Sequence, residues 1–594
     1  MNPNKVGLFG LSLLGLGMQN GTGMVAEKNA VRPNIVLILS DDQGWGDLAI
    51  NGNLAANTPN INRIAHEGAS FSNFYVCPVC SPTRSELLTG RYAVRAGVCD
   101  VSNGGERIDL DETTIADYFK KAGYATGAFG KWHSGTQYPY HPNARGFDEF
   151  YGFCSGHLGN YWNPMLDHNG EIVEGKGFIT NDLTNRAIEY VKKNKEKPFF
   201  VYIPYNTPHS PMQVPDNWWN KYKNINIIQN ATEASREDKT HTKAVLALSE
   251  IVDWNVGRMM ETLKTLGLDD RTIIIYLSDN GPNGHRWNGG MKGVKGSTDE
   301  GGVRSPFFIR WKGKIQAGRN VEQLSSVVDL LPTLLDLAGV KPPLYNKPLD
   351  GVSLKSILLN NEDRNIDRTL FSHWGKKTAV RVQDYLLGSE GQLYNTKIDR
   401  EQKNDISVSN PAMFEKLKKS LAYYNENILT ELPPKDTRPF LLGHPKERLS
   451  MLPARDGKAH GGIERSNKFP NSSFFTNWTK TTDSITWNVE VVESGLFEAM
   501  VYYTCAPEDV GSVINLKIGR NRLITKLTKA NDTPMLGADL DRVPRAESYE
   551  KGWIPFTLGN IKMDKGKTTL VIKADQIPHF EAMNLRMLVF RRIQ

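Results

Sequence analysis

Four short strand-like runs, each followed by polar or charged residues, are the feature that most restricts the fold of this chain. The runs occupy residues 35–39, 124–129, 199–203 and 273–277. Mainly apolar runs of this length are typical of strands buried on both faces of a sheet. Helical or loop-like segments separate them, as in proteins that wind helices around a parallel sheet. We therefore predict an α/β domain built on a mixed, largely parallel sheet flanked by helices.

The polar clusters that follow these runs are expected to lie together in one site. Open α/β sheets bind ligands beyond the carboxyl ends of their strands, so loops that follow separate strands meet in one crevice. Side chains that are far apart in the sequence are then expected to lie close together. They are Asp41 and Asp42, Lys131 and His133, His209, and Asp279 and Asn280.

Two adjacent carboxylates, Asp41 and Asp42, directly follow the first run. Carboxylates at the end of a buried strand need a partner, and a hard cation suits two oxygen donors best. Asp279 and Asn280 repeat the pattern after the fourth run. The alternative is that all four are ordinary capping and turn residues in a solvated loop.

Cys80 opens the sequence C-S-P-T-R-S-E-L-L-T-G. Pro82 suits the first turn of a helix, because its φ is preset and that turn needs no amide hydrogen, and Gly90 can end the helix. A cysteine just before a helix start lies among unpaired amides, which favour an anion and a reactive thiol, and Arg84 adds positive charge one turn on. The alternatives are a buried, inert thiol or a redox pair with Cys77, although no thioredoxin-like βαβ unit surrounds it.

The pattern C-x-P-x-R-x-x-x-L-x-G resembles the signature of the type I sulfatases, a family of the alkaline phosphatase superfamily, and the resemblance covers roughly residues 32–430. It implies an alkaline-phosphatase-like fold. It also implies that a formylglycine-generating maturation enzyme oxidises Cys80 to formylglycine, whose hydrate is the nucleophile. The metal ligands that it implies offer oxygen donors, which suit Ca²⁺ or Mg²⁺ rather than zinc. They are Asp41, Asp42, Asp279, Asn280 and the residue formed from Cys80.

The same resemblance implies catalytic roles around Cys80. Lys131 and His133 match the family's G-K-W-H motif, His209 its H-x-P motif, and Lys295 the lysine before the E-G-G-x-R segment. Arg84, Lys131 and Lys295 would neutralise the sulfate. His209, with Lys295, would protonate or stabilise the leaving alcohol, and His133 would take the proton from the second hydroxyl of the hydrate.

One residue departs from the family's pattern, and for one catalytic position the sequence offers a second candidate. Thr83 stands where family members often carry serine, and Lys292 lies close enough to Lys295 to compete for its role. For the substrate, the implied contacts are Lys131, His209 and Lys295, and His285 is added because it follows Asp279 closely. Weaker candidates, each of which could be ordinary surface, are Arg286, Trp287, Tyr161 and Trp162.

At 594 residues the chain is too long for one ordinary domain. We expect a signal peptide at 1–30, because a positive charge precedes an apolar run too short to span a bilayer. A catalytic domain follows at 31–345, then an α+β subdomain at 346–435 with a hairpin around 389–391 and a helix over 413–428. Alternating apolar residues predict a β-sandwich over 446–594. This last domain resembles carbohydrate-binding modules, or it only packs or dimerises.

The net charge and the number of cysteines limit which kinds of binding partner and disulfide pairing we expect. A formal charge of +7 is small for this length and does not form the basic stripe of a nucleic-acid binder. Beyond the N-terminal run, no stretch is long and apolar enough for a membrane helix, so we expect no integral membrane protein but a secreted or periplasmic one. Five cysteines are an odd number, which leaves at least one unpaired.

Together these features predict a sulfatase that hydrolyses sulfate monoesters on a sulfated carbohydrate. The carbohydrate could be an algal polymer, such as ulvan or carrageenan, or a host glycan. A phosphodiesterase or phosphonate hydrolase of the same superfamily could use the same formylglycine and a similar cation. Outside the enzyme class, the alternative is a catalytically inactive glycan-binding protein with the sulfatase fold.

Overall fold

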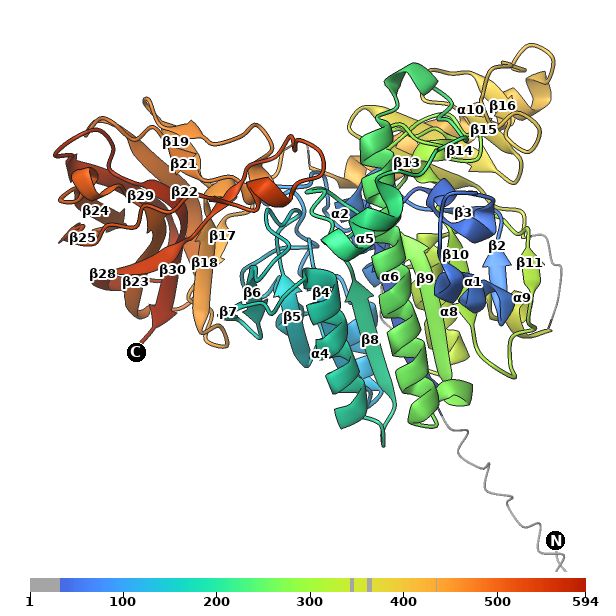
Figure 1. Ribbon diagram of the computed structural model, residues 1–594, viewed down its shortest axis with the longest axis horizontal. Helices are drawn as coiled ribbons and strands as arrows, with labels where there is room; N and C mark the ends of the chain where they lie inside the picture. Colours follow the sequence, from blue (N-terminus) through green and yellow to red (C-terminus); the bar gives the residue numbers. More distant parts are fainter. Residues whose placement is uncertain (1–31, 342–346, 361–365, 434, 594) are drawn as a thin grey trace, which may run out of the picture.

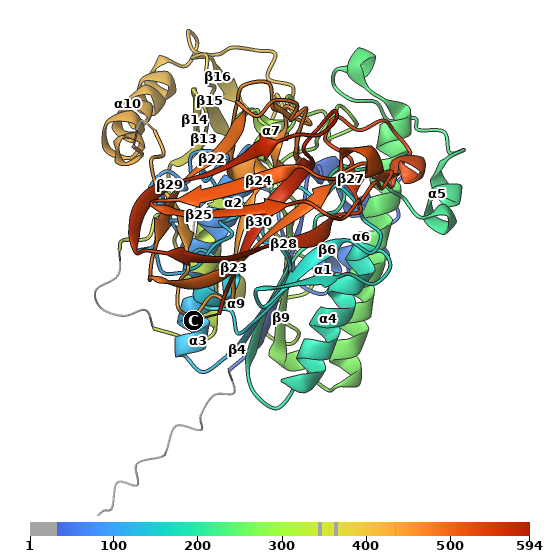
Figure 2. The ribbon, with the colours of Figure 1, turned by 90° about the vertical axis from the view of Figure 1, so that its left-hand side faces the viewer.

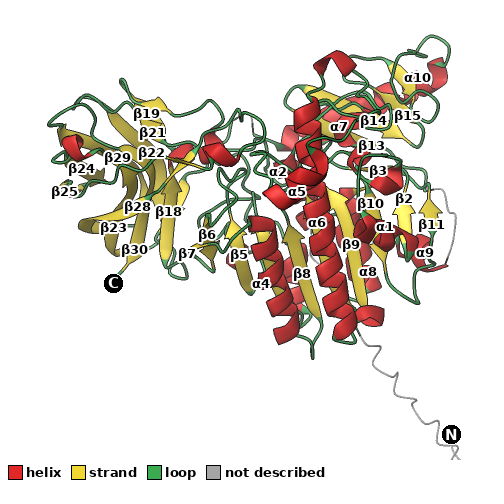
Figure 3. Cartoon of the chain, in the orientation of Figure 1, coloured by secondary structure: helices red, strands yellow, loops and turns green. Residues whose placement is uncertain are grey.

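The computed structural model describes residues 32–341, 347–360, 366–433 and 435–593. The predicted signal peptide lies outside these residues. Figures 1 and 3 show a strand-rich C-terminal part beside a larger part in which helices pack on a central sheet. Across the described ranges, no helix is both long enough and apolar enough to cross a membrane.

A ten-stranded mixed sheet forms the centre of the larger part. Its five middle strands run parallel, and antiparallel pairs occur toward both edges. The predicted fold class, a mixed and largely parallel α/β sheet, is thereby confirmed. In spatial order the strands are β11 (Arg319–Val321), β2 (Ala69–Phe71), β10 (Phe307–Arg310), β9 (Thr272–Ser278), β1 (Asn34–Ser40), β8 (Phe199–Pro204), β4 (Ala125–Lys131), β5 (Glu149–Phe153), β6 (Met165–His168) and β7 (Glu171–Glu174).

The four predicted strands are the adjacent strands β9, β1, β8 and β4, in that order. β1 pairs in parallel with both β9 and β8, so that Ser40 lies opposite Ser278 and Leu39 opposite Pro204. The carboxyl ends of these strands therefore share one edge of the sheet. The sequence analysis did not identify β5, which continues the parallel set beside β4.

Different helices cover the two faces of the sheet, because alternate side chains of each strand point to opposite faces. Leu37 of β1 packs with α2 (Cys80–Thr89), α3 (Ile115–Lys121) and α8 (Leu330–Leu337), whereas Ile38 packs with α1 (Pro59–His66), α4 (Ile179–Lys193) and α6 (Lys239–Thr265). Asp238 caps α6 by accepting from the amides of Thr240 and His241. The shorter helices are α5 (Asp216–Tyr222), α7 (Glu300–Val303) and α9 (Lys355–Asn360).

Helix α2 differs slightly from its predicted start. Cys80 is its first residue, whereas the sequence placed it just before the helix. Gly90 ends the helix at φ 67°, in the left-handed region where a glycine pays no steric penalty, as expected. All ten residues of α2 are buried, so its N-terminus lies in the interior of the protein.

A small α+β unit follows the central sheet. It consists of a four-stranded antiparallel sheet and α10 (Pro411–Asn427), which begins two residues before the predicted helix. The strands are β13 (Leu370–Trp374), β14 (Lys377–Val382), β15 (Tyr385–Leu387) and β16 (Leu393–Asn395). The region predicted as one hairpin holds two tight reversals, since β15 pairs with both β14 and β16. Elsewhere, β3 (Phe74–Tyr75) pairs with β12 (Ser325–Ser326).

The C-terminal part is a sandwich of two mainly antiparallel sheets (Figure 2). Trp478 and Trp487 are fully buried in its core. The turn at residues 493–494 passes from one sheet to the other. One sheet contains β17 (Phe440–Leu442), β19 (Lys458–His460), β22 (Ser484–Val491), β24 (Val513–Ile518), β25 (Asn521–Lys526) and β29 (Gly566–Gln576). The other contains β18 (Leu449–Pro453), β20 (Glu464–Arg465), β21 (Phe475–Thr476), β23 (Gly495–Thr504), β28 (Ile554–Met563) and β30 (Asn584–Arg592).

Glu447 links the sandwich to the central-sheet part. One carboxyl oxygen accepts from the backbone amide of Tyr138, at 3.0 Å, and the other accepts from the Ser450 hydroxyl. Burial raises the pKa of Glu447 to about 8. The carboxyl is therefore protonated in the folded protein under conditions where an exposed glutamate is ionised.

Replacing Glu447 with glutamine should stabilise the protein increasingly as the pH rises. The stability that the wild-type carboxyl contributes is fully present below its ordinary pKa of 4.5 and is lost as the pH rises toward about 8, because only the unfolded chain then releases the proton. The loss is at most about 1.4 kcal/mol per pH unit. Thermal unfolding at acidic pH and at about pH 8 should show the variant's advantage in Tm growing toward the higher pH.

The matched control is Glu390→Gln, an exposed carboxyl in the turn between β15 and β16. Its Tm difference from wild type should not change with pH. A Glu447→Gln variant whose Tm difference is equally independent of pH would contradict the prediction.

Candidate active site

The carboxylates predicted after β1 and β9 lie together at the edge of the sheet. The backbone amide of Asp42 donates to Asp279 Oδ1 at 3.2 Å, and Asn280 Nδ2 donates to Asp42 Oδ1 at 2.8 Å. Asp41, Asp42, Asp279 and Asn280 are each no more than 1% exposed. Asp42 has φ 62°, a left-handed conformation that costs energy for an aspartate and occurs at functional sites.

Three basic side chains neutralise these carboxylates. Arg84, from α2, pairs with Asp279 Oδ2 at 2.7 Å, and Lys131 Nζ, at the end of β4, donates to Asp41 Oδ2 at 2.7 Å. Lys295 Nζ lies 2.7 Å from Asp42 Oδ1. Burial, the largest single influence, would lower the pKa of Lys295, but Asp42, Cys80 and Asp41 together outweigh it and raise that pKa. The lysine is therefore charged where it meets the cluster.

Cys80 lies within this group of charges. Its side chain is 4% exposed, and its sulfur, a carboxylate oxygen of Asp41 and one of Asp279 all lie within 4.8 Å of one another. Arg84, one turn further along α2, also donates to the Lys131 carbonyl at 2.7 Å. The structure thus brings the predicted nucleophile position, metal ligands and basic residues into one place.

The site suits a hard divalent cation. Asp41 Oδ1 and Asn280 Oδ1 are buried and have no hydrogen-bond partner within the described part of the chain, and buried oxygens normally have one. Burial, followed by repulsion from Asp41, raises the pKa of Asp279 to about 7. Oxygen donors of this kind are typical ligands of Ca²⁺ and Mg²⁺.

His133 is fully buried two residues after Lys131. Its Nε2 lies 2.8 Å from the Val101 carbonyl oxygen, so this nitrogen donates and Nδ1 carries the lone pair. Nδ1 has no partner in the part of the chain that the structure describes. Burial, helped by the charge of Lys131, lowers the pKa of His133 well below its usual value. The residue is therefore a neutral imidazole with a free basic nitrogen.

His209 lies in the loop after β8. Its Nδ1 donates to the Ser210 carbonyl at 2.8 Å, and its Nε2 lies 3.5 Å from Asp42 Oδ2. Tyr161 is fully buried, and its hydroxyl contacts the carbonyls of His209 and Ser210 at 2.7 and 3.1 Å. Tyr161 therefore fixes the His209 loop and has no surface for a substrate.

The other substrate candidates occupy different surroundings. Lys292 lies 3.8 Å from Asp299, so Lys295 and not Lys292 is the lysine that reaches Asp42. His285 faces Glu233 at 3.7 Å and makes no contact with the carboxylate cluster that the described residues reveal. Arg286 contacts the backbone of the cluster, because its guanidinium donates to the Asp42 carbonyl at 2.9 Å. Trp162 packs on Phe178, and Trp287 lines a separate cavity of about 540 Å³.

Two residues that the sequence analysis missed lie beside His209. A ring nitrogen of His157, one of His209 and a carboxylate oxygen of Glu547 are all within 4.8 Å of one another. His157 follows β5, the parallel strand that was not predicted, so recognising that strand would have pointed to it. Glu547 belongs to the sandwich, and no local pattern marks it.

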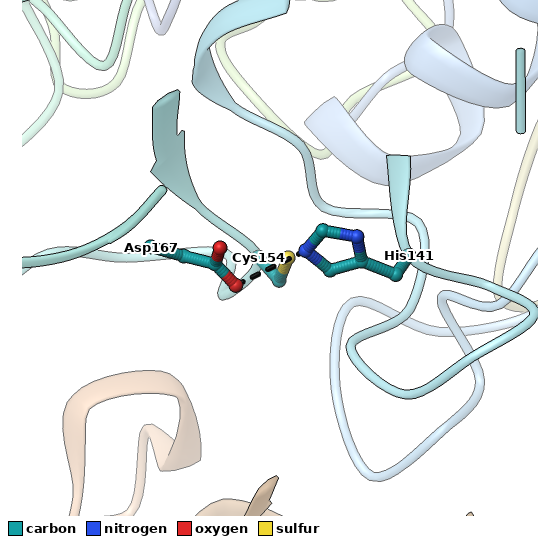
Figure 4. Close-up of side chains that lie close together, drawn as sticks. All are labelled: His141, Cys154 and Asp167. Carbon is teal, nitrogen blue, oxygen red and sulfur yellow. Dashed lines mark hydrogen bonds and ion pairs between the residues drawn. The ribbon is translucent and has the colours of Figure 1, made fainter. Parts of the chain in front are cut away.

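A separate cluster, His141, Cys154 and Asp167, has a structural arrangement (Figure 4). His141 Nε2 pairs with Asp167 Oδ2 at 3.1 Å, and its Nδ1 accepts from the Asn143 amide at 3.3 Å. Both ring nitrogens are thus used within the protein. Burial raises the pKa of the Cys154 thiol well above its usual value, so the cluster offers neither a free imidazole nor a reactive thiolate. All five cysteines are unpaired thiols.

Comparison with known proteins identifies the family. The family described as Sulfatase matches residues 33–340, and that described as N-sulphoglucosamine sulphohydrolase, C-terminal, matches residues 295–394. N-acetylgalactosamine-6-sulfatase of Mus musculus is 32% identical over 400 residues, which cover 61% of this chain and 73% of the mouse protein. A sulfatase of Escherichia coli (strain K12), YdeN, is 33% identical over 415 residues, which cover 59% of this chain and 71% of the bacterial protein.

A solved structure agrees with these sequence matches. The structure of Ps i-CgsB in complex with k-i-k-neocarrahexaose superposes with a TM-score of 0.62 and 33% identity, covering 68% of this chain and 96% of that protein. The first family match alone spans more than half of the chain, across the strands and loops that build the site. The chain therefore belongs to the type I sulfatase family of the alkaline phosphatase superfamily and is a sulfuric ester hydrolase.

Proposed function

We propose that this sulfatase hydrolyses sulfate monoesters of a saccharide, with formylglycine at position 80 and a divalent cation, Ca²⁺ or Mg²⁺, bound by its oxygen ligands. The observation that carries the proposal is the position of Cys80. It begins a buried helix, and carboxylates and three basic side chains surround it. A formylglycine at this position would lie beside the carboxylates that could hold the cation and the basic side chains that could bind a sulfate.

The cation and the modified residue would supply chemistry that no unmodified side chain of the site offers. When present, they provide an activated hydroxyl for attack on sulfur and positive charge beside it. Asp41, Asp42, Asp279 and Asn280 would hold the cation. The three carboxylates among them are matched by three basic residues, so a divalent cation leaves the site positive and able to attract a sulfate ester.

The basic side chains would bind and orient the sulfate. Arg84, Lys131 and Lys295 approach the cluster from α2, β4 and the loop before α7. Positive groups fixed in advance stabilise the charge that develops on the sulfate oxygens during transfer, without reorganising during the reaction. Their ion pairs with buried carboxylates keep them in place.

Two histidines would move the protons. His209 Nε2 faces the cluster, since Nδ1 is committed to the Ser210 carbonyl, and it would give a proton to the leaving alcohol. His133 holds a lone pair on Nδ1 and would accept a proton when sulfate is released.

A saccharide substrate is supported by the names of the relatives. One is an N-acetylgalactosamine-6-sulfatase, and a structure of another was solved with k-i-k-neocarrahexaose. Both are 32–33% identical to this chain. A C-terminal β-sandwich also favours a carbohydrate over a small aryl sulfate. Algal galactans and host glycans are the two sources that a panel of defined sulfated oligosaccharides would separate.

Replacing Cys80 with alanine should abolish sulfate release, because alanine cannot be converted to formylglycine. Ion chromatography of sulfate released from oligosaccharides measures this loss. Mass spectrometry of the wild-type peptide, purified from a host with the maturation enzyme, should show position 80 about 18 Da lighter than a thiol. Sulfate release by the alanine variant at near the wild-type rate would rule out the proposed nucleophile.

Removing the cation should lower sulfate release at least about 100-fold, since it takes away the largest positive charge beside the sulfate. Dialysis against a chelator, followed by addition of Ca²⁺ or Mg²⁺, tests this and identifies the ion that restores activity. Elemental analysis should find about one divalent ion per chain in wild type and less in Asp279→Asn. Asp270→Asn, at an exposed carboxyl, should keep the ion. Full activity in the cation-free protein would contradict the prediction.

Lys295 and Lys292 form a matched pair on one loop. Lys295→Ala should lower kcat/KM about 100-fold or more, because it removes a positive group that contacts the cluster. Lys292→Ala should change kcat/KM less than about threefold, since this lysine pairs with Asp299 and lies over the ring of Tyr394. Equal losses in the two variants would show that proximity to Asp42 does not decide the role.

A further inference from the structure

A loop of the sandwich lies against the active-site part of the protein. It comprises residues 537–549, between β26 (Met535–Leu536) and β27 (Glu550–Lys551). Figure 1 shows orange-red segments of the sandwich reaching toward α2, above the central sheet. Gln213 Nε2 donates to the Gly537 carbonyl at 2.9 Å, and the Arg542 amide donates to the Met212 carbonyl at 3.0 Å. The loop is thus paired with the segment that follows His209.

Charged side chains hold this loop in one conformation. Arg545 and Asp541 form an ion pair at 2.6 Å with side chains 0% and 4% exposed, and Arg545 also donates to the Gly159 carbonyl. The guanidinium of Arg542 donates to the Val214 carbonyl at 2.7 Å. Buried, fully partnered charges fix geometry even where they add little stability. The residues between them are therefore held in defined positions.

Glu547 is the loop residue that reaches the site. Its Oε1 accepts from the Ser210 hydroxyl at 2.7 Å, and its carboxylate lies within 4.8 Å of the ring nitrogens of His157 and His209. His209 is the residue expected to face the leaving alcohol. Glu547 therefore places a hydrogen-bond acceptor with negative charge on the leaving-group side of the sulfate.

His157 is the second unexplained residue. It is 5% exposed, its ring centre lies 5.2 Å from that of His209, and neither ring nitrogen has a hydrogen-bond partner anywhere in the described ranges. Burial lowers the pKa of His157 to about 3, so the ring is neutral and offers one donor and one acceptor. Buried polar groups normally have partners, which points to a ligand for this histidine.

The donors present favour a hydroxyl ligand over a transition metal. His209 Nδ1 already donates to a carbonyl and its Nε2 faces Asp42, so the cluster cannot supply three free ligands. A sugar hydroxyl both donates and accepts. It can donate to the Glu547 carboxylate and exchange a hydrogen bond with His157.

We propose that His157 and Glu547 bind hydroxyl groups of the sugar that carries the scissile sulfate, so that the C-terminal sandwich completes the active site. The inference rests on the proposed function, because it needs a sulfated saccharide as substrate. A fixed carboxylate repels a second anion, so the preferred sugar carries a free hydroxyl, and not another sulfate, at the position that meets Glu547.

A second contact from the sandwich supports the same conclusion. Asn471 Nδ2 donates at 3.1 Å to the Val101 carbonyl, which is the acceptor of His133 Nε2. Arg455, 1% exposed, donates to Glu106 at 2.9 Å and to Thr136 at 3.0 Å across the junction. The sandwich therefore orients a proton-transfer residue as well as lining the sugar side.

Binding measured without turnover tests the inference. Each protein is the full chain carrying Cys80→Ala, and calorimetry measures a sulfated oligosaccharide that wild type desulfates, and inorganic sulfate separately. Glu547→Gln and His157→Ala should each weaken oligosaccharide binding about tenfold or more and change sulfate binding less than about threefold. Asp539→Asn, the same acid-to-amide change at an exposed carboxyl of this loop, should alter neither.

Turnover provides the specificity measurement. With Cys80 intact, Glu547→Gln should raise kcat/KM for a disulfated sugar relative to its monosulfated counterpart about fivefold or more, because the repelling charge is gone. Circular dichroism and thermal unfolding confirm that each variant is folded.

The outcomes separate this inference from the proposed function. Wild type that carries formylglycine and cation, yet releases sulfate from no saccharide, overturns the proposed function. Wild type that is active while Glu547→Gln and His157→Ala bind the oligosaccharide as tightly as Asp539→Asn overturns this inference alone. Equal loss of sulfate and oligosaccharide binding, or a stoichiometric transition metal that His157→Ala removes, would also overturn it.

Discussion

A buried set of opposite charges at the carboxyl edge of the sheet is the interaction on which the site depends. Three carboxylates with almost no solvent exposure would be very costly alone. Arg84, Lys131 and Lys295 offset that cost, and they arrive from a helix, a strand and a loop. The carboxylates are therefore neutralised only when the helix, the strand and the loop are all correctly packed on the sheet. The charge balance of the site thus depends on the fold.

Backbone strain accompanies this balance of charge. Asp42 and His133 both have positive φ, at 62° and 58°, although neither is a glycine. Such conformations persist only where the surroundings over-determine them. Here the Asp279 carboxylate accepts from the Asp42 amide, and the Val101 carbonyl accepts from His133. Both of these residues belong to the predicted site.

The sandwich belongs to the same system of contacts. Glu447, Arg455 and Asn471 lie on its side of the junction and bond to the loops that follow β4 and β5. Glu447 and Arg455 are buried and Asn471 is half-buried, so much of this polar junction is shielded from water. Among the described residues, the C-terminal part contacts the loops that carry His133 and His157.

Sequence reasoning anticipated the part of the site that local patterns encode. Strand ends mark Asp41 and Asp279, because a buried run that stops in carboxylates is visible along the chain. It chose Lys295 through the resemblance to the family motif and left Lys292 as a competitor, since which ammonium group reaches Asp42 depends on the tertiary structure. His285 was selected for its nearness in sequence to Asp279; its ring faces Glu233, and its contact with a substrate stays a prediction.

The amino-acid sequence alone determined the α/β class, the convergence of strand-end residues and the presence of a helix that ends at Gly90, because burial on both faces of a sheet and helix termination depend on short stretches of residues. Only the tertiary structure decided that Glu547 lies beside His209. That contact joins residues more than 300 positions apart through a loop whose conformation depends on the Asp541–Arg545 ion pair and on pairing with Gln213. No local sequence pattern specifies this contact, since the surfaces that form it exist only after both parts of the protein have folded.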